Sequence, residues 1–361
     1  MSSLDSAIRL LADRKYHQCF RLAATDKHEE LRVTFATSTN FDDNVLPVVL
    51  FVGPMFGSRY FCTDYNKLAI SSKIRFICVD RPGFGGSSNV PIEDRVNIWL
   101  ETVPQLLKHL NVNYVSLISH SAGTIYLLNT LYHLRHILDP KRPYVALLAP
   151  WVSQEHSGVT MLSLASKLPN AAFSGWSGLV GFINRTLVPA GSWSGGIISS
   201  SASLFQSSPS EAEVTSEETA QARWGTDAAT VAAIDGLQAK YCWAEGMSGA
   251  NDEARLCLGG GKGLWGVCED YSEYVRKFCA AERQRSDADR LLELHVVFAT
   301  SDIMIGTGGK AYFEEVWGQD CVAGCVDVKM VQAPGTNHET VLNFEKGLMH
   351  KIFKDIGGNA A

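Results

Sequence analysis

The turn that decides the fold is Ile118-Ser119-His120-Ser121-Ala122-Gly123-Thr124. It follows the strand-like apolar run 114–118 and precedes a helical pattern of apolar residues that starts at Ile125. The small residues around Ser121 predict a sharp strand-to-helix turn, because they let the strand and the helix approach closely. The Ser121 hydroxyl is then held at the carboxyl edge of the sheet, where amides at the helix N-terminus favour negative charge. Ser121 is therefore the candidate nucleophile.

On either side of this turn, strand-like runs alternate with helical patterns. A hairpin is expected first, from 16–23 and 31–36. The later apolar runs are continuous, as in strands buried on both faces of a parallel sheet. They cover residues 48–52, 74–79, 114–118, 144–148 and 294–298, and a last strand is expected at 326–331. Helices are expected from Val96 to Leu110 and from Glu339 to Ile352. This alternation predicts an α/β fold with a mostly parallel sheet and helices on both faces.

The alternation stops after Trp151 and resumes near residue 294. An interval of about 140 residues is too long for a loop and must hold an inserted subdomain. We expect residues 1–151 and 291–361 to form the core, and residues 152–290 to form a large, mainly helical cap. The cap tryptophans either form its own small core or face the site and favour a hydrophobic group. They are Trp176, Trp193, Trp224, Trp243 and Trp265.

Composition excludes several classes of function. Hydrophobic residues make up 46% and charged residues 19% of the 361, as in a globular enzyme. The net charge is −6 and no basic run is present, which argues against nucleic-acid binding. Neither a basic, apolar leader nor an apolar stretch of membrane-spanning length is visible, so we expect a cytoplasmic protein. Nine scattered cysteines without a Cys-x-x-Cys pair predict free thiols, and no metal or other cofactor is expected.

A glycine-rich loop, Asp80-Arg81-Pro82-Gly83-Phe84-Gly85-Gly86-Ser87, follows the second apolar run. One interpretation is a dinucleotide-binding Gly-x-Gly-x-x-Gly, but the third glycine would fall at Ser88 and no helix opens there. The favoured interpretation is a structural loop, whose glycines permit a tight turn beside the site.

Together these segments resemble the α/β-hydrolase superfamily, in particular its capped, fungal serine hydrolases. The turn at Ser121 resembles the superfamily's Gly-x-Ser-x-Gly nucleophile elbow, with Ser119 in place of the first glycine. The loop at 80–87 looks like its Asp-x-x-Gly-x-Gly-x-Ser loop. The resemblance covers residues of about 30–151 and 291–350. It implies the α/β-hydrolase fold and an acyl-enzyme mechanism.

The resemblance also implies an oxyanion hole. Gly53-Pro54-Met55-Phe56-Gly57-Ser58 is similar in register to the superfamily's His-Gly-x-x-Gly-Ser loop, with Gly53 and Pro54 replacing the first two residues. The donor amide maps onto Met55, since proline has no N–H to give. The second donor is the amide of Ala122. The missing histidine leaves open how the loop is anchored.

The general base is expected after the last strand, where His338 stands in Ala333-Pro334-Gly335-Thr336-Asn337-His338-Glu339. The acid is expected after the preceding strand, where Asp302 stands, which gives the superfamily's chain order of serine, acid and histidine. Two alternatives remain: Glu155 is a second candidate acid, and Asp302 could instead be a helix cap. His120 is expected to be structural or to line the pocket.

These residues favour hydrolysis of an ester, lactone or thioester of a small hydrophobic substrate. An acyltransferase, lyase or cyclase using the same site is one alternative, and a ligand-binding relative without catalysis is another. Epoxide hydrolases and dehalogenases that resemble this chain carry an aspartate at the position of Ser121, which argues against their chemistry. The sequence leaves the substrate's identity and the oligomeric state open.

Overall fold

The computed structural model describes residues 1–159, 215–258, 263–285 and 290–358. Their sheet has the order β1-β2-β4-β3-β5-β6-β7-β8. The strands are β1 (Gln18–Leu22), β2 (Leu31–Thr37), β3 (Val48–Val52), β4 (Arg75–Val79), β5 (Ser116–His120), β6 (Tyr144–Leu148), β7 (Leu292–Ser301) and β8 (Val326–Asn337). β2 runs antiparallel to β1 and β4, and all other neighbours are parallel. The expected hairpin and mostly parallel sheet are confirmed.

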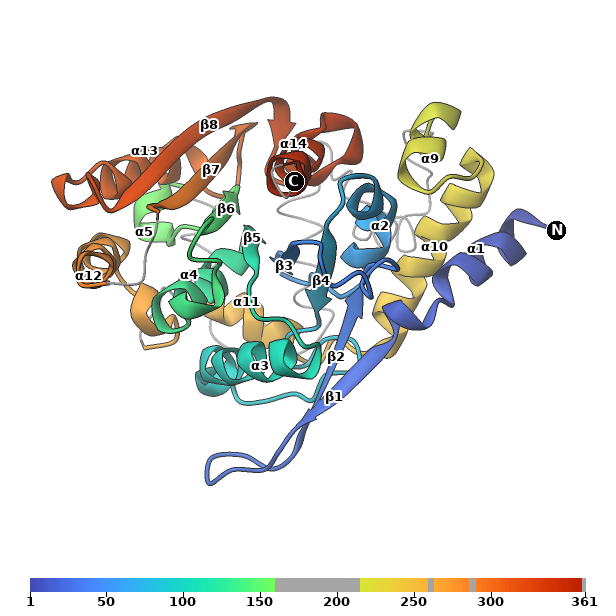
Figure 1. Ribbon diagram of the computed structural model, residues 1–361, viewed down its shortest axis with the longest axis horizontal. Helices are drawn as coiled ribbons and strands as arrows, with labels where there is room; N and C mark the ends of the chain where they lie inside the picture. Colours follow the sequence, from blue (N-terminus) through green and yellow to red (C-terminus); the bar gives the residue numbers. More distant parts are fainter. Residues whose placement is uncertain (160–214, 259–262, 286–289, 359–361) are drawn as a thin grey trace.

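Helices cover both faces of this sheet, as Figure 1 shows. The described helices are α1 (Ser3–Leu11), α2 (Phe61–Ser71), α3 (Arg95–His109), α4 (Gly123–His133), α5 (Gln154–Ser157), α9 (Glu217–Arg223), α10 (Ala228–Glu245), α11 (Ala250–Leu258), α12 (Tyr271–Arg283), α13 (Gly306–Trp317) and α14 (Leu348–Gly357). One apolar core lies between the sheet and α3, α4, α11, α12 and α13. The other lies between the opposite face and helices α2 and α14. The buried strands β3, β4 and β6 serve both cores, which explains their uninterrupted apolar sequences.

The end of the chain departs from the prediction in two ways. The last strand does not end at Val331 but continues to Asn337, along residues that are mostly exposed or half-buried and carry no apolar pattern. The final helix begins at Leu348 and not at Glu339, because two short 3₁₀ turns, Thr340–Leu342 and Phe344–Lys346, come first. Gly347 has a left-handed backbone with φ of 69°, so a single helix cannot run through it.

The described part of residues 152–290 packs closely against the rest of the chain. Helix α10 lies against α1, and α9 lies against α2 (Figure 1). Trp265 is fully buried in the apolar core that contains α4, and its indole N–H donates to the carbonyl of Leu256. Trp224 packs against the α1–α10 contact. Trp176 and Trp193 lie outside the described residues, and the division into core and cap stays a prediction. Within the described part of the chain, none of the helices has the length and apolar character needed to cross a membrane.

Candidate active site

Ser121 stands on a strained turn between β5 and α4. Its φ is 51°, a left-handed value that is uncommon for a residue with a side chain and that is found at functional turns. The turn is held by main-chain hydrogen bonds, since the Ser121 amide donates to the Leu148 carbonyl at 3.0 Å and the Trp151 amide donates to the Ser121 carbonyl at 3.2 Å. The Ser121 residue is only 4% exposed. Main-chain bonds to Leu148 and Trp151 therefore fix the backbone that carries this hydroxyl.

His338 follows directly after β8 and reaches the Ser121 hydroxyl. The distance from His338 Nε2 to Ser121 Oγ is 2.7 Å, and the imidazole is buried. The preceding residue orders this turn, because the Asn337 side-chain oxygen accepts hydrogen bonds from the amides of Glu339 and Thr340. The extension of β8 beyond the predicted Val331 thus carries the imidazole to the site.

Asp302 follows β7 and binds the other ring nitrogen of His338. Its Oδ2 lies 2.8 Å from His338 Nδ1. Its Oδ1 accepts hydrogen bonds from the amides of Met304 and Ile305, at 2.9 and 3.0 Å. The carboxylate therefore binds His338 and orders the turn before α13 at the same time, but it is not the helix cap, because the N-cap residue of α13 is Ile305.

The electrostatics of this pair favour opposite charges. Burial lowers the pKa of His338, but the Asp302 carboxylate and its hydrogen bond outweigh burial, so the net pKa is raised above the ordinary 6.5. Burial raises the pKa of Asp302, but the His338 charge and the three hydrogen bonds outweigh it, leaving the pKa below the ordinary 3.8. An ionised Asp302 fixes the tautomer with hydrogen on Nδ1, which leaves Nε2 free to accept the Ser121 proton.

Glu155, the alternative acid, lies on α5 with an exposed side chain. Among the described residues, the carboxylate that binds the His338 ring is that of Asp302. The structure thus brings Ser121, His338 and Asp302 together and leaves Glu155 at the surface.

Met55 and Ala122 lie on two segments that are packed together. Ala122 immediately precedes α4, and Met55 is in the turn in which the Gly57 amide donates to the Pro54 carbonyl at 2.8 Å. A Cβ atom added to Gly123 would lie 2.2 Å from the Val52 carbonyl oxygen, so the start of α4 touches the end of β3. Within the described residues, neither the Met55 amide nor the Ala122 amide donates to a carbonyl. The expectation that these two amides form an oxyanion hole stays a prediction.

The anchor of the Met55 loop, which the sequence left open, is Arg81. Its guanidinium donates to the carbonyls of Gly53 and Pro54, at 2.8 and 2.5 Å. Arg81 in turn forms a buried ion pair with Glu253 of α11, which also binds Arg95. Sequence reasoning missed these residues. Arg81 could have been noticed in the loop after β4, but no pattern singled out Glu253.

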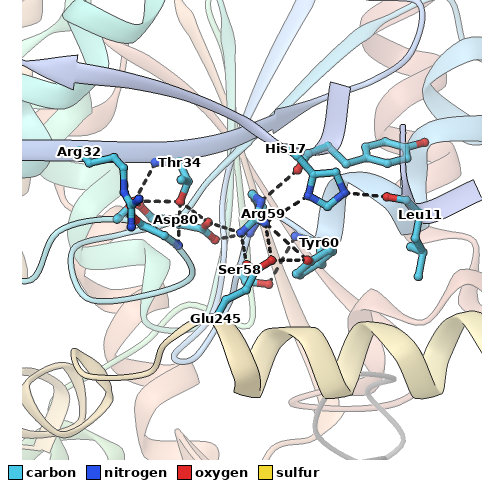
Figure 2. Close-up of polar contacts among 12 residues, drawn as sticks. Leu11, His17, Arg32, Thr34, Ser58, Arg59, Tyr60, Asp80 and Glu245 are labelled. Carbon is cyan, nitrogen blue, oxygen red and sulfur yellow. Dashed lines mark hydrogen bonds and ion pairs between the residues drawn. The ribbon is translucent and has the colours of Figure 1, made fainter. Parts of the chain in front are cut away.

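A second ion-pair cluster lies beside the first and joins the end of α10 to the loops that follow β3 and β4. Figure 2 shows Arg59 between Asp80 and Glu245, the last residue of α10. Arg59 donates to Asp80 Oδ2 at 2.8 Å, and Tyr60 donates its hydroxyl hydrogen to Glu245 at 2.7 Å. The hydroxyl of Thr34, in β2, also donates a hydrogen bond to the Asp80 carboxylate. The Asp80 loop therefore has a structural role, fixing β2 and the end of α10.

His120, next to Ser121, is fully buried and faces His338. Its Nε2 lies 2.7 Å from the His338 carbonyl oxygen. Burial and the neighbouring His338 lower the pKa of His120 to about 3, so its ring is neutral. The neutral ring donates its Nε2–H to that carbonyl. Among the described residues there is no group of three or more His, Cys, Asp or Glu side chains arranged to hold a metal ion.

Comparison with known proteins finds similarity at the level of structure alone. No protein-family model and no curated protein matches the sequence. Esterase E22 is 12% identical, with a TM-score of 0.56 over 94% of this chain and 99% of its own. An epoxide hydrolase from Vigna radiata is 14% identical, with a TM-score of 0.52 over 96% and 97%. An alpha/beta hydrolase enzyme from a Medee basin deep-sea metagenome is 12% identical, with a TM-score of 0.51 over 95% and 98%.

Proposed function

Because the chain has the α/β-hydrolase fold, we propose that it is a serine hydrolase that cleaves an ester, lactone or thioester of a hydrophobic small molecule. The observation that carries the proposal is the unbroken hydrogen-bond chain from Ser121 through His338 to Asp302. A shared fold does not define an activity, and similar structures include both esterases and an epoxide hydrolase. The hydroxyl nucleophile and its aligned base favour acyl transfer.

In the first step, the neutral imidazole of His338 takes the proton of Ser121 through Nε2. The freed Oγ electron pair forms a bond to the substrate's carbonyl carbon, and the carbonyl π electrons move onto its oxygen. The amides of Met55 and Ala122 donate hydrogen bonds to that oxyanion. When the oxyanion collapses, the bond to the leaving group breaks, and His338 returns the proton to the leaving alcohol or thiol. The product is an ester between Ser121 and the acyl group.

Asp302 acts on this step through His338. Its carboxylate keeps hydrogen on Nδ1 and stabilises the imidazolium that forms when Ser121 loses its proton. The two amides that bind Asp302 Oδ1 hold the carboxylate in place during the transfer. The raised pKa of His338 agrees with a base whose protonated form is stabilised.

In the second step, water replaces the leaving group. His338 takes a proton from the water, and the resulting oxygen nucleophile attacks the acyl carbon. The bond to Ser121 breaks as His338 returns the proton to Oγ, which releases the acid and restores the site. The burial of Ser121 and His338, which are 4% and 2% exposed, supports an apolar substrate, since small-molecule sites are lined mostly by apolar side chains. We include in this proposal a cap formed by residues 152–290.

The test is covalent labelling by a fluorophosphonate probe, followed by peptide mass analysis. We expect the wild-type protein to be labelled at Ser121 and the Ser121→Ala variant not to be labelled. Ser119→Ala is the matched control, because this neighbouring serine is buried and its hydroxyl has no hydrogen-bond partner among the described residues. Labelling of Ser121→Ala at the wild-type rate, or a wild-type protein that is never labelled, overturns the proposal.

A further inference from the structure

The guanidinium of Arg81 holds the two successive carbonyls that precede Met55. Its Nη1 donates to Gly53 and its Nη2 donates to Pro54, whose oxygen also accepts the Gly57 amide. The carbonyl and the following amide of a trans peptide point in opposite directions. Fixing the Pro54 carbonyl toward Arg81 therefore directs the Met55 amide away from Arg81.

The nucleophile turn lies against the same loop. A Cβ atom added to Gly123 would lie 2.7 Å from the Gly53 carbonyl oxygen, which is the oxygen that binds Arg81 Nη1 at 2.8 Å. The loop is therefore in contact with both the guanidinium and the start of α4. A shift of the guanidinium would move the Met55 amide relative to Ser121.

Arg81 is itself fixed by an acid that the insertion supplies. Glu253 of α11 accepts hydrogen bonds from Arg81 Nε at 2.8 Å and from Arg95 Nη2 at 2.9 Å, and its Oε1 lies within ion-pair distance, 2.6 Å, of Arg81 Nη2. All three side chains are at most 1% exposed. The Tyr126 ring lies beneath the Arg81 guanidinium, 5.1 Å from its centre. These contacts with Glu253 and Tyr126 leave the Arg81 guanidinium little room for another orientation.

We propose that Arg81 and Glu253 are positioning residues for the oxyanion hole, so that docking of the insertion completes the site. This inference rests on the proposed function and extends it to a dependence of catalysis on the insertion. It requires that a change in either residue weaken the binding of the oxyanion while leaving the ground-state binding of the substrate intact.

The experiment compares Arg81→Lys and Glu253→Gln with Glu245→Gln. Lysine keeps the charge at position 81 but cannot bind two carbonyls and a carboxylate with one planar group. Glu245→Gln is the matched control, since it also weakens an insertion-to-core ion pair but touches neither Gly53 nor Pro54. Each variant is assayed with 4-nitrophenyl butyrate and with a trifluoromethyl ketone, whose adduct with serine carries an oxyanion. Circular dichroism reports whether each variant is folded.

We expect kcat to fall about 10- to 100-fold in Arg81→Lys and Glu253→Gln. This fall is no larger than the one caused by removing an oxyanion-hole donor outright. KM should change by less than about twofold, because ground-state binding is unaffected. Affinity for the trifluoromethyl ketone should fall in parallel with kcat, whereas Glu245→Gln should keep the wild-type kcat even if its melting temperature drops.

A folded Arg81→Lys or Glu253→Gln with wild-type kcat overturns the inference. Failure of both variants to fold also counts against it, since the cluster would then determine stability. An inactive, unlabelled wild-type protein instead refutes the proposed function.

Discussion

The ring of His120 donates a hydrogen bond to the main-chain carbonyl of His338, with a distance of 2.7 Å between Nε2 and the oxygen. The residue before the proposed nucleophile thus holds the backbone of the proposed base. The two rings also lie close, with centroids 5.3 Å apart. Burial and the neighbouring His338 lower the pKa of His120 to about 3, so the ring that donates this bond is neutral at neutral pH.

Replacing His120 should therefore impair catalysis through the position of His338. In His120→Ala the buried carbonyl loses its donor, and displacement of the base by even about 1 Å lowers kcat by up to roughly 100-fold. His120→Gln should recover much of this loss, because the glutamine amide can donate to the same carbonyl. Steady-state kinetics on an activated ester measures both. Equal losses in the two variants would show that the ring, and not its hydrogen bond, is what matters.

The pH profile of kcat/KM should report the titration of His338. Only the neutral imidazole accepts the Ser121 proton, so activity rises with pH through a pKa above 6.5. In Asp302→Asn the carboxylate that raises the pKa of His338 is gone, while burial still lowers that pKa. The inflection of the kcat/KM profile should therefore move to lower pH. The plateau should fall by about 10⁴-fold, because the tautomer is no longer fixed. Glu155→Gln, at the surface, should leave the profile unchanged. If the inflection of the kcat/KM profile does not move in Asp302→Asn, the pairing of Asp302 with His338 is wrong.

The same ion pair should give the free energy of unfolding a defined pH dependence. The pKa of Asp302 is lowered on folding, so its contribution is present above the unfolded value of 3.8 and is lost as pH falls through the folded pKa. The pKa of His338 is raised, so its contribution is present below 6.5 and is lost as pH rises through the folded pKa. Denaturation of the wild type and of Asp302→Asn should thus differ most between about pH 4 and 6.5. A difference that grows steadily above this range would contradict the assignment.

Much of the sheet could be predicted because buried parallel strands leave a simple signal. Strands β3 and β6 match the apolar runs 48–52 and 144–148 residue for residue, since every side chain in them is buried. The end of the chain lacked that signal. Strand β8 continues to Asn337 along residues that are mostly exposed or half-buried, and Gly347 then delays the last helix to Leu348. Periodicity reports burial, so exposed extensions and single left-handed residues escape it.

The site was predictable in part for a related reason. Ser121, Asp302 and His338 each follow a strand, and the carboxyl ends of parallel strands meet at one edge of a sheet. The contact of Arg81 with Glu253 joins residues 172 positions apart and follows no repeat. Charged side chains are rarely buried, so a sequence gives no reason to expect these two in the interior. The resemblance of the loop at 53–58 indicated where the Met55 amide lies but not what fixes it.

The contact between the nucleophile turn and β3 leads to a last prediction, for Gly123. A Cβ atom there would lie 2.2 Å from the Val52 carbonyl oxygen and 2.7 Å from that of Gly53, and both are main-chain atoms that cannot rotate away. In Gly123→Ala the start of α4 must move off β3, which should destabilise the fold by roughly 1–3 kcal/mol. The same shift separates Ala122 from Met55, so esterase activity should fall further than the loss of folded protein explains.

Gly236→Ala, inside α10, is the matched control, because nothing lies within 4 Å of its added Cβ. It should be neutral or stabilise the protein by about 0.5–1 kcal/mol, through the better helix propensity of alanine. Urea denaturation and kcat measured below the transition separate the two effects, and a fully active Gly123→Ala would mean that the turn and the loop need not touch for catalysis.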